Sequence, residues 1–146
     1  MKFNRRLFLA LPALAPLRAL GFESTDEHRF HYDHVIGTSM DLAVWTKSRE
    51  AAQYASRAAL HEIARLTRIL STYEPDSEIR RFESGDPIAS RELAEVIELY
   101  RYWESKTGGV LSIRPSGNAL NVDALGKAYI IDLAAAAIRK AAPEVR

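Results

Sequence analysis

Apolar and polar residues alternate over residues 30–46, "FHYDHVIGTSMDLAVWT". Met40, Leu42 and Val44 are separated by single residues, which is the period of two expected of a half-buried strand. Gly37 interrupts the pattern and permits a turn or a bulge. The segment therefore predicts two strands that are joined near Gly37.

Three later segments have apolar residues every three or four positions, the spacing of an amphipathic helix. The first helix should run from about Arg49 to about Leu70 and begin after Ser48 as its N-cap. The second should follow Ser90 and end at residues 108–109, which are two glycines, and the third should begin near Gly126. The positions expected to be buried are Ala52, Ala55, Ala59, Ile63, Leu66, Leu70, Leu93, Val96, Ile97, Tyr100, Ile130, Leu133, Ala134, Ala137, Ile138 and Ala141.

Shorter elements are predicted between these helices. Residues 78–82, "EIRRF", should form a short helical turn after Asp76 and Ser77, whose side chains can cap it. Residues 110–113 and 120–122 are brief strand candidates. Strands and helices in this order predict an α+β domain with a small mixed sheet and two or three packed helices. The 146 residues are enough for one such domain.

The first 21 residues have the layout of a secretory signal peptide. Lys2, Arg5 and Arg6 precede an apolar run over residues 7–17, and small residues follow at Ala19 and Gly21. The arginine pair in "NRRLFLA" also resembles a twin-arginine export signal, although ordinary Sec signals contain such pairs too. We therefore predict a signal peptide over residues 1–21 and a mature domain over residues 22–146. The protein should be exported, to the periplasm or to the outer face of the cytoplasmic membrane.

Export would change the charge balance of the chain. The whole sequence has 20 Lys and Arg against 19 Asp and Glu, whereas residues 22–146 have 16 against 19, a net charge of −3. A nucleic-acid partner is not expected, because binding to a phosphate backbone needs clustered positive charge. The sequence contains no cysteine, which excludes disulfides, thiolate metal sites and a cysteine nucleophile.

Three histidines lie close together in "HRFHYDH", at His28, His31 and His34. Imidazoles and the neighbouring Asp33 are suitable metal ligands. A strand, however, places His31 on the face opposite His28 and His34. Solvated residues next to the first strand are the better interpretation, and His61, in the middle of the first helix, should be a surface residue.

Two loops contain candidate binding residues. Tyr73 follows the first long helix, where its ring could cover a planar ligand ring or simply cap the helix core. In "NVDALGKAY", backbone N–H groups at a helix N-terminus could attract an anion beside Lys127, and free carbonyls could coordinate Mg²⁺. The same stretch could equally serve only as a connection. It is neither a P-loop nor a dinucleotide-binding fingerprint.

The segments "GTSM", "ILSTYEPDSEIRRF", "SRELAEVIELYRYWESKTGGVLS" and "NVDALGKAYIID" occur in the order seen in the FAD:protein FMN transferases. The similarity extends from about residue 34 to residue 143. This resemblance implies the N-terminal half of the flavin transferase fold. It also implies an exported enzyme that binds FAD and Mg²⁺, transfers FMN to a threonine hydroxyl of a flavin-accepting protein, and releases AMP.

The resemblance also implies a set of site residues. The residues matching cofactor contacts are Ile36, Tyr73, Val110, Leu111, Ser112, Asn121 and Lys127, and the residue matching a magnesium contact, through its carbonyl, is Ala124. Ile36 stands where the family usually has methionine. Asn121 and Ser112 each stand where the family has an acidic residue, so two negative charges are absent from the expected site.

Other parts of the family pattern do not occur in the sequence. Only "IRPSGNAL" separates "GGVLS" from "NVDALGK", where the family has a longer insertion. The family's second half contributes a glycine-rich strand, a histidine motif and the acidic magnesium ligands. We therefore expect part of a flavin transferase site, with little or no catalysis alone, from a truncated gene product or one that needs a complementary C-terminal half. The alternatives are a non-catalytic exported module that binds a flavin or a partner chain, and an exported domain without a ligand.

Overall fold

The computed structural model describes residues 25–115, 117 and 119–145, which form a β-hairpin and four helices. The predicted signal peptide lies outside this part of the chain. The elements, in order, are β1 (Asp26–Val35), β2 (Thr38–Thr46), α1 (Arg49–Leu70), α2 (Glu78–Glu83), α3 (Arg91–Lys106) and α4 (Asp123–Ala141). The prediction of a small α+β domain is confirmed.

The two strands form an antiparallel hairpin, as the alternation of apolar residues predicts. Tyr32 lies opposite Met40 and Val35 lies opposite Thr38. Between these two pairs β1 has two residues and β2 has one, so β1 contains a bulge. The bulge interrupts the strict alternation of faces just before the hairpin turns.

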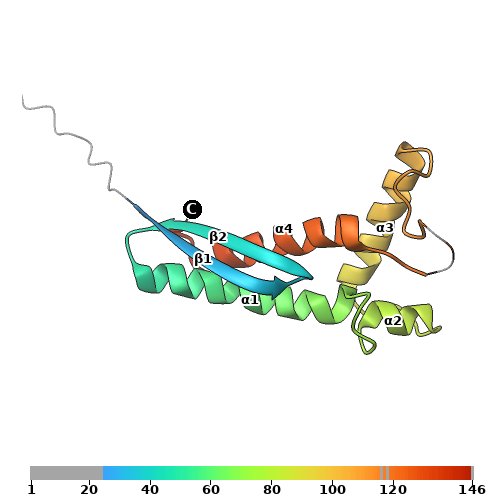
Figure 1. Ribbon diagram of the computed structural model, residues 1–146, viewed down its shortest axis with the longest axis horizontal. Helices are drawn as coiled ribbons and strands as arrows, with labels where there is room; N and C mark the ends of the chain where they lie inside the picture. Colours follow the sequence, from blue (N-terminus) through green and yellow to red (C-terminus); the bar gives the residue numbers. More distant parts are fainter. Residues whose placement is uncertain (1–24, 116, 118, 146) are drawn as a thin grey trace, which may run out of the picture.

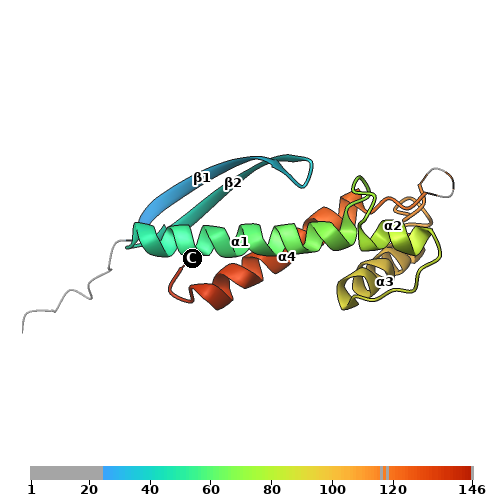
Figure 2. The same ribbon diagram turned by 90° about the horizontal axis from the view of Figure 1, so that it is seen from below.

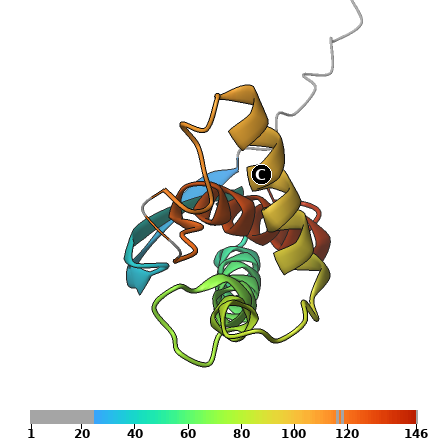
Figure 3. The ribbon, with the colours of Figure 1, turned by 90° about the vertical axis from the view of Figure 1, so that its right-hand side faces the viewer.

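The long helices α1 and α4 lie side by side and run in opposite directions (Figure 1). The hairpin lies lengthwise over them on one side (Figure 2). At the far end of α1, α2 continues roughly along its direction and α3 crosses the end of the molecule (Figures 1 and 3). The end of α1, the turn of the hairpin and the beginning of α4 therefore meet in one region.

Serine side chains cap the first three helices, each at a serine that the sequence indicates. The Ser48 side chain accepts a hydrogen bond from the N–H of Ala51, and the Ser90 side chain accepts one from the N–H of Leu93. Ser77 caps α2 in the same way, so the expected helical turn forms there. Each cap satisfies an N–H group that has no partner within its helix.

The apolar residues of the helices form two clusters. The larger one joins α1, α2, α3 and α4, and its most buried members include Leu66, Ile79, Leu93 and Val96. The smaller one lies at the opposite end of α1 and joins the hairpin to the end of α4; its buried members are Val44, Ala52, Ala55, Ala142 and Val145. Because residues far apart in the sequence share each cluster, the hairpin is held against both long helices.

Three local predictions are wrong. α4 begins at Asp123, three residues before the expected start at Gly126. Residues 110–113 and 120–122 form no strand in the described structure. A strand needs a neighbouring strand for its backbone hydrogen bonds, and in the described structure the two strands of the hairpin pair only with each other.

None of the helices in the described residues has the length and apolar character needed to span a bilayer.

Candidate functional site

A cavity of about 260 Å³ opens where the hairpin turn, the end of α1 and the beginning of α4 meet. The hairpin contributes Ile36, the loop after α1 contributes Tyr73, and α4 contributes Asp123 and Lys127. Leu70 and Ile130 form part of its apolar lining. The structure thus brings together three of the predicted cofactor-binding residues, Ile36, Tyr73 and Lys127.

The hairpin turn has an unusual backbone conformation. Ile36 and Gly37 form the two-residue connection, with φ of 45° and 77°. Positive φ at both positions is the requirement of a type I′ turn, which matches the twist of the strands. Glycine adopts this conformation readily, whereas a β-branched residue such as isoleucine rarely does, at a cost of about 1–3 kcal/mol. The turn therefore holds an apolar side chain at the cavity where glycine or asparagine would be the easier choice.

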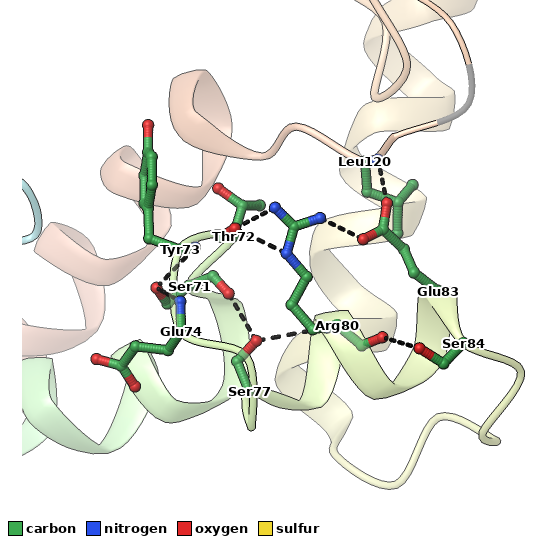
Figure 4. A network of polar contacts seen from close by, with 9 residues as sticks. All are labelled: Ser71, Thr72, Tyr73, Glu74, Ser77, Arg80, Glu83, Ser84 and Leu120. Atoms are coloured by element: carbon green, nitrogen blue, oxygen red, sulfur yellow. Dashed lines mark hydrogen bonds and ion pairs between the residues drawn. The ribbon is translucent and has the colours of Figure 1, made fainter.

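The loop after α1 is fixed by polar contacts with α2 (Figure 4). The Arg80 side chain donates to the carbonyl of Thr72, with its Nε at 2.7 Å, and also contacts Glu83. The Ser77 hydroxyl donates to the carbonyl of Ser71 at 2.6 Å. These bonds hold the two residues before Tyr73, while the Tyr73 ring extends away from Arg80 and Glu83.

Tyr73 is 77% exposed, so it does not act as a cap of the hydrophobic core. Its hydroxyl donates a hydrogen bond to Oδ2 of Asp123 at 3.0 Å. This hydrogen bond, followed by repulsion from the carboxylate charge, raises the pKa of the Tyr73 phenol. The two candidate loops of the sequence are therefore in direct contact, and an aromatic ring stands largely in solvent beside the cavity.

Three of the four N–H groups at residues 123–126, the start of α4, are hydrogen-bonded within the protein. The N–H of Asp123 donates to Oδ1 of Asn121 at 2.9 Å, and the N–H of Gly126 donates to the carbonyl of Val122 at 2.7 Å. The N–H of Leu125 donates to the hydroxyl of Tyr100, a residue of α3. These bonds leave fewer N–H groups for an anion, and the anion site expected on the backbone at residues 121–127 stays a prediction.

Tyr100 of α3 replaces the missing N-cap side chain of α4. Val122 occupies the N-cap position and makes no side-chain cap. The Tyr100 hydroxyl instead accepts a hydrogen bond from the N–H of Leu125 at 3.2 Å. Burial raises the pKa of Tyr100, and the amides of Leu125 and Ala124 partly offset this. The beginning of α4 is thus positioned by a buried residue of another helix.

Replacing Tyr100 by phenylalanine should lower the free energy of unfolding by about 1–2 kcal/mol, because it leaves the part-buried N–H of Leu125 without its partner. Tyr102→Phe, two residues along the same helix, is the matched control: this residue is 54% exposed and its change should stay within about 0.5 kcal/mol. Urea denaturation measures both. Equal stability of the two variants would contradict the capping role of Tyr100.

Lys127 is the cation of this cavity. It lies one turn after Asp123 on α4, is half-buried, and forms no hydrogen bond or ion pair with the described residues. Glu74 and His34 complete the ionisable groups of the lining. With three of the backbone donors at residues 123–126 engaged, Lys127 is the charged group through which the cavity could hold an anion.

The other predicted site residues lie outside this cavity. Asn121 lines a neighbouring hollow of about 300 Å³, which shares Thr72 and Tyr73 with the cavity. Ala124, whose carbonyl matches a magnesium contact, lies exposed in the first turn of α4. In a helix, such a carbonyl points along the axis toward the N–H of the residue four positions later.

The segment 110–112 is also separate from the cavity. Val110 is 87% exposed, Leu111 packs against the larger core, and the Ser112 side chain accepts from the N–H of Arg114. The structure does not bring these three residues to Tyr73.

The clustered histidines take separate partners. His28 contacts the carbonyl of Thr46 at 3.2 Å, and His31 is paired with Asp41 at 2.7 Å. His34 follows the bulge, has a φ of 59°, and lines the cavity. His61 is exposed on α1, as expected. The described residues contain no group of three or more His, Asp or Glu side chains able to hold a metal.

Sequence reasoning missed Asp123 and His34. Asp123 stands in the candidate loop, but its role depends on Tyr73, 50 residues earlier. His34 reaches the cavity because of the bulge, and strict alternation does not predict a bulge. An acidic residue in the first turn of a helix is common, so Asp123 has no local signal of its own. His34 has none either, because the bulge that brings it to the cavity cannot be read from its neighbours.

The structure is a small α+β domain with an aromatic side chain, an apolar side chain and a cation around one cavity. Residues 36–115 match the ApbE family. The chain therefore belongs to this family, which is the family of FAD:protein FMN transferases. No curated protein and no solved structure matches the chain.

Membership makes the chain a flavin transferase-like protein. The family uses FAD as a substrate, requires a divalent metal and acts on flavin-accepting proteins. The matched range includes Ile36 and Tyr73 but ends before Asp123 and Lys127. The part of the cavity formed by α4 therefore rests on the structure alone.

Proposed function

We propose that the chain binds the flavin of FAD at this cavity and forms one wall of a site that transfers FMN to a threonine of an acceptor protein. The contact between the exposed Tyr73 ring and the beginning of α4, 3.0 Å from hydroxyl to carboxylate, carries the proposal. An exposed aromatic ring beside an apolar opening is suited to stacking on a planar ligand.

The cavity is suited to part of FAD. Its volume of about 260 Å³ lies below the roughly 300–1,000 Å³ typical of pockets that enclose a drug-sized ligand. Tyr73 and Ile36 offer ring and aliphatic contacts to the isoalloxazine, while Lys127 offers a charge to the diphosphate. The adenosine would extend beyond the cavity toward solvent or toward a partner.

The proposed transfer is a displacement at phosphorus. The threonine oxygen of the acceptor attacks the phosphorus on the FMN side of the diphosphate, the bond to the AMP oxygen breaks, and the threonine proton is lost. The described residues do not fit a magnesium site, because they lack a group of three carboxylate or imidazole ligands. We assign no step to Mg²⁺ on this chain and propose that a complementary polypeptide supplies the carboxylates.

The same observation supports a second candidate, a non-catalytic flavin-binding module. Incubation with FAD, Mg²⁺ and a threonine-containing acceptor separates the two, with mass spectrometry of the acceptor as the readout. We expect flavin binding by the chain alone and FMN attachment only when a complementary half is added. Failure of FAD to bind would contradict both candidates, and turnover by the chain alone would contradict the need for a second polypeptide.

Lys127→Gln should weaken FAD binding by about threefold to tenfold, because it removes a charge-assisted contact to the diphosphate. Riboflavin, which has no phosphate, should bind to the variant and to the wild type equally. Titration by flavin fluorescence measures both ligands, and added salt should reduce the difference for FAD. Lys140→Gln, on the exposed end of α4, is the control. Equal loss for both ligands would mean that Lys127 does not contact phosphate.

We propose further that the protein is exported, through a signal peptide over residues 1–21. The support is the sequence pattern of Lys2, Arg5, Arg6 and the apolar run after them. Expression of the full chain in a bacterial host, followed by fractionation and N-terminal sequencing, tests this. An uncleaved chain in the cytoplasm would contradict the proposal.

A further inference from the structure

We infer that Asp123 is a positioning residue that holds the Tyr73 ring in place for flavin binding; this inference rests on the proposed function above. Asp123 lies in the first turn of α4, and its carboxylate is the hydrogen-bond acceptor of the Tyr73 hydroxyl. The inference assigns a role to a side chain that the candidate loops alone do not single out.

The Tyr73 ring has little other support. It is 77% exposed, and its backbone N–H donates to the Ser71 hydroxyl at 3.2 Å, which fixes the main chain but leaves the ring free to rotate. Within the described residues, the bond to Asp123 is the one hydrogen bond of the phenol. An exposed tyrosine without such a bond would sample several rotamers, and a ligand that stacks on it would have to order the ring on binding.

Both ends of this bond lie on fixed backbone. On one side, Arg80 and Ser77 hold the residues that precede Tyr73. On the other side, the N–H of Asp123 donates to Asn121, whose own N–H donates to the carbonyl of Ile113 at 2.8 Å. A ring that is bonded between two fixed segments is preorganised, and preorganisation is what allows a binding group to contribute its full contact energy.

The charge of Asp123 argues against a role as a direct phosphate contact. A carboxylate beside an anionic diphosphate is repulsive, and Lys127 and Glu74 line the same cavity. Because Asp123 would repel the diphosphate of FAD, its better explanation is that it holds the Tyr73 ring in place. Its bond with Tyr73 also connects the loop after α1 to α4, so the two walls of the cavity keep their spacing.

The test uses riboflavin, because this probe has no phosphate and so reports on the ring without the charge effect of removing Asp123. Asp123→Ala and Tyr73→Phe should each weaken riboflavin binding by about threefold to tenfold, the range expected for one lost hydrogen bond. The double variant should bind about as well as either single one, since both remove the same bond. Asp123→Asn retains an acceptor oxygen and should restore binding to near the wild-type level.

A second readout does not depend on ligand. The pH at which Tyr73 ionises, followed by NMR of the tyrosine ring carbons, should fall in Asp123→Asn and in Asp123→Ala, because the negative charge that opposes ionisation is gone.

The outcomes separate the two proposals. Additive effects of Asp123→Ala and Tyr73→Phe on riboflavin, or an unchanged pKa of Tyr73 in both Asp123 variants, would overturn the positioning role. If the wild type binds no riboflavin or FAD, the proposed function is wrong. Even if no flavin binds, a lowered pKa of Tyr73 in the Asp123 variants would support the hydrogen bond between Tyr73 and Asp123. An unchanged pKa would overturn that hydrogen bond.

Discussion

Replacing Tyr73 by alanine is expected to weaken the binding of both riboflavin and FAD by about 1–3 kcal/mol, the range measured when an aromatic stacking partner is removed. This corresponds to a loss of about 5- to 150-fold in affinity. The loss should exceed that of Tyr73→Phe, because alanine removes the ring as well as the hydroxyl. It should also be alike for the two ligands, since both contain the isoalloxazine.

Flavin fluorescence titration against each variant is the measurement. Tyr54→Ala provides the matched control, because Tyr54 is also exposed but lies on α1 away from the cavity lining. Circular dichroism should be unchanged for Tyr73→Ala, since an exposed ring contributes little to the fold. If Tyr73→Ala binds riboflavin as tightly as the wild type does, the flavin does not stack on this ring.

Replacing Glu78 by alanine should lower the free energy of unfolding by about 2–4 kcal/mol, because it removes the acceptor of two backbone hydrogen bonds. Glu78 is 7% exposed at the first residue of α2. Its Oε1 accepts from the N–H groups of Ala89 at 2.9 Å and Ser90 at 2.7 Å. These bonds tie α2 to the beginning of α3, and alanine would leave both donors without an acceptor.

The same carboxylate makes stability depend on pH. Burial alone would raise the pKa of Glu78, but the hydrogen bonds from Ser90 and Ala89 outweigh it and hold the pKa below the ordinary value of 4.5. The folded state therefore releases this proton at lower pH than the unfolded state does. The stabilisation is complete above pH 4.5 and is lost as the pH falls through the lower folded value.

Urea denaturation of the wild type and Glu78→Gln at several pH values isolates this contribution, because Glu62 and Glu83 also have lowered pKa values and contribute to both proteins. The stability difference between the two proteins should shrink as the pH falls below 4.5. Glu98→Ala, on the exposed face of α3, should be nearly neutral at pH 7. A difference that stays constant down to pH 3 would contradict the assignment to Glu78.

Most of the fold could be predicted because its signals are local. The alternation at Met40, Leu42 and Val44 and the capping serines at residues 48 and 90 mark the hairpin and the long helices α1 and α3 within a few residues. The start of α4 could not be predicted, because its first turn is satisfied by Tyr100, a side chain from another helix. No property of residues 121–126 alone indicates that partner.

The candidate site could also be predicted only in part. The resemblance points to Ile36, Tyr73 and Lys127, and these three meet around the cavity. The binding of a phosphate by the backbone stays a prediction, although the N–H groups of Asp123 and Leu125 are already hydrogen-bonded within the protein. The role of Asp123 could not be predicted, because it depends on a contact with Tyr73, 50 positions earlier in the sequence.

The conformation of Ile36 has a consequence for protein engineering. Glycine or asparagine at this position would relieve the unfavourable φ, so a selection for thermal tolerance alone would tend to favour these replacements. Such a selection would at the same time remove an aliphatic wall of the cavity. A more heat-resistant form of this protein obtained in that way would lack the aliphatic side chain that the proposed flavin site uses.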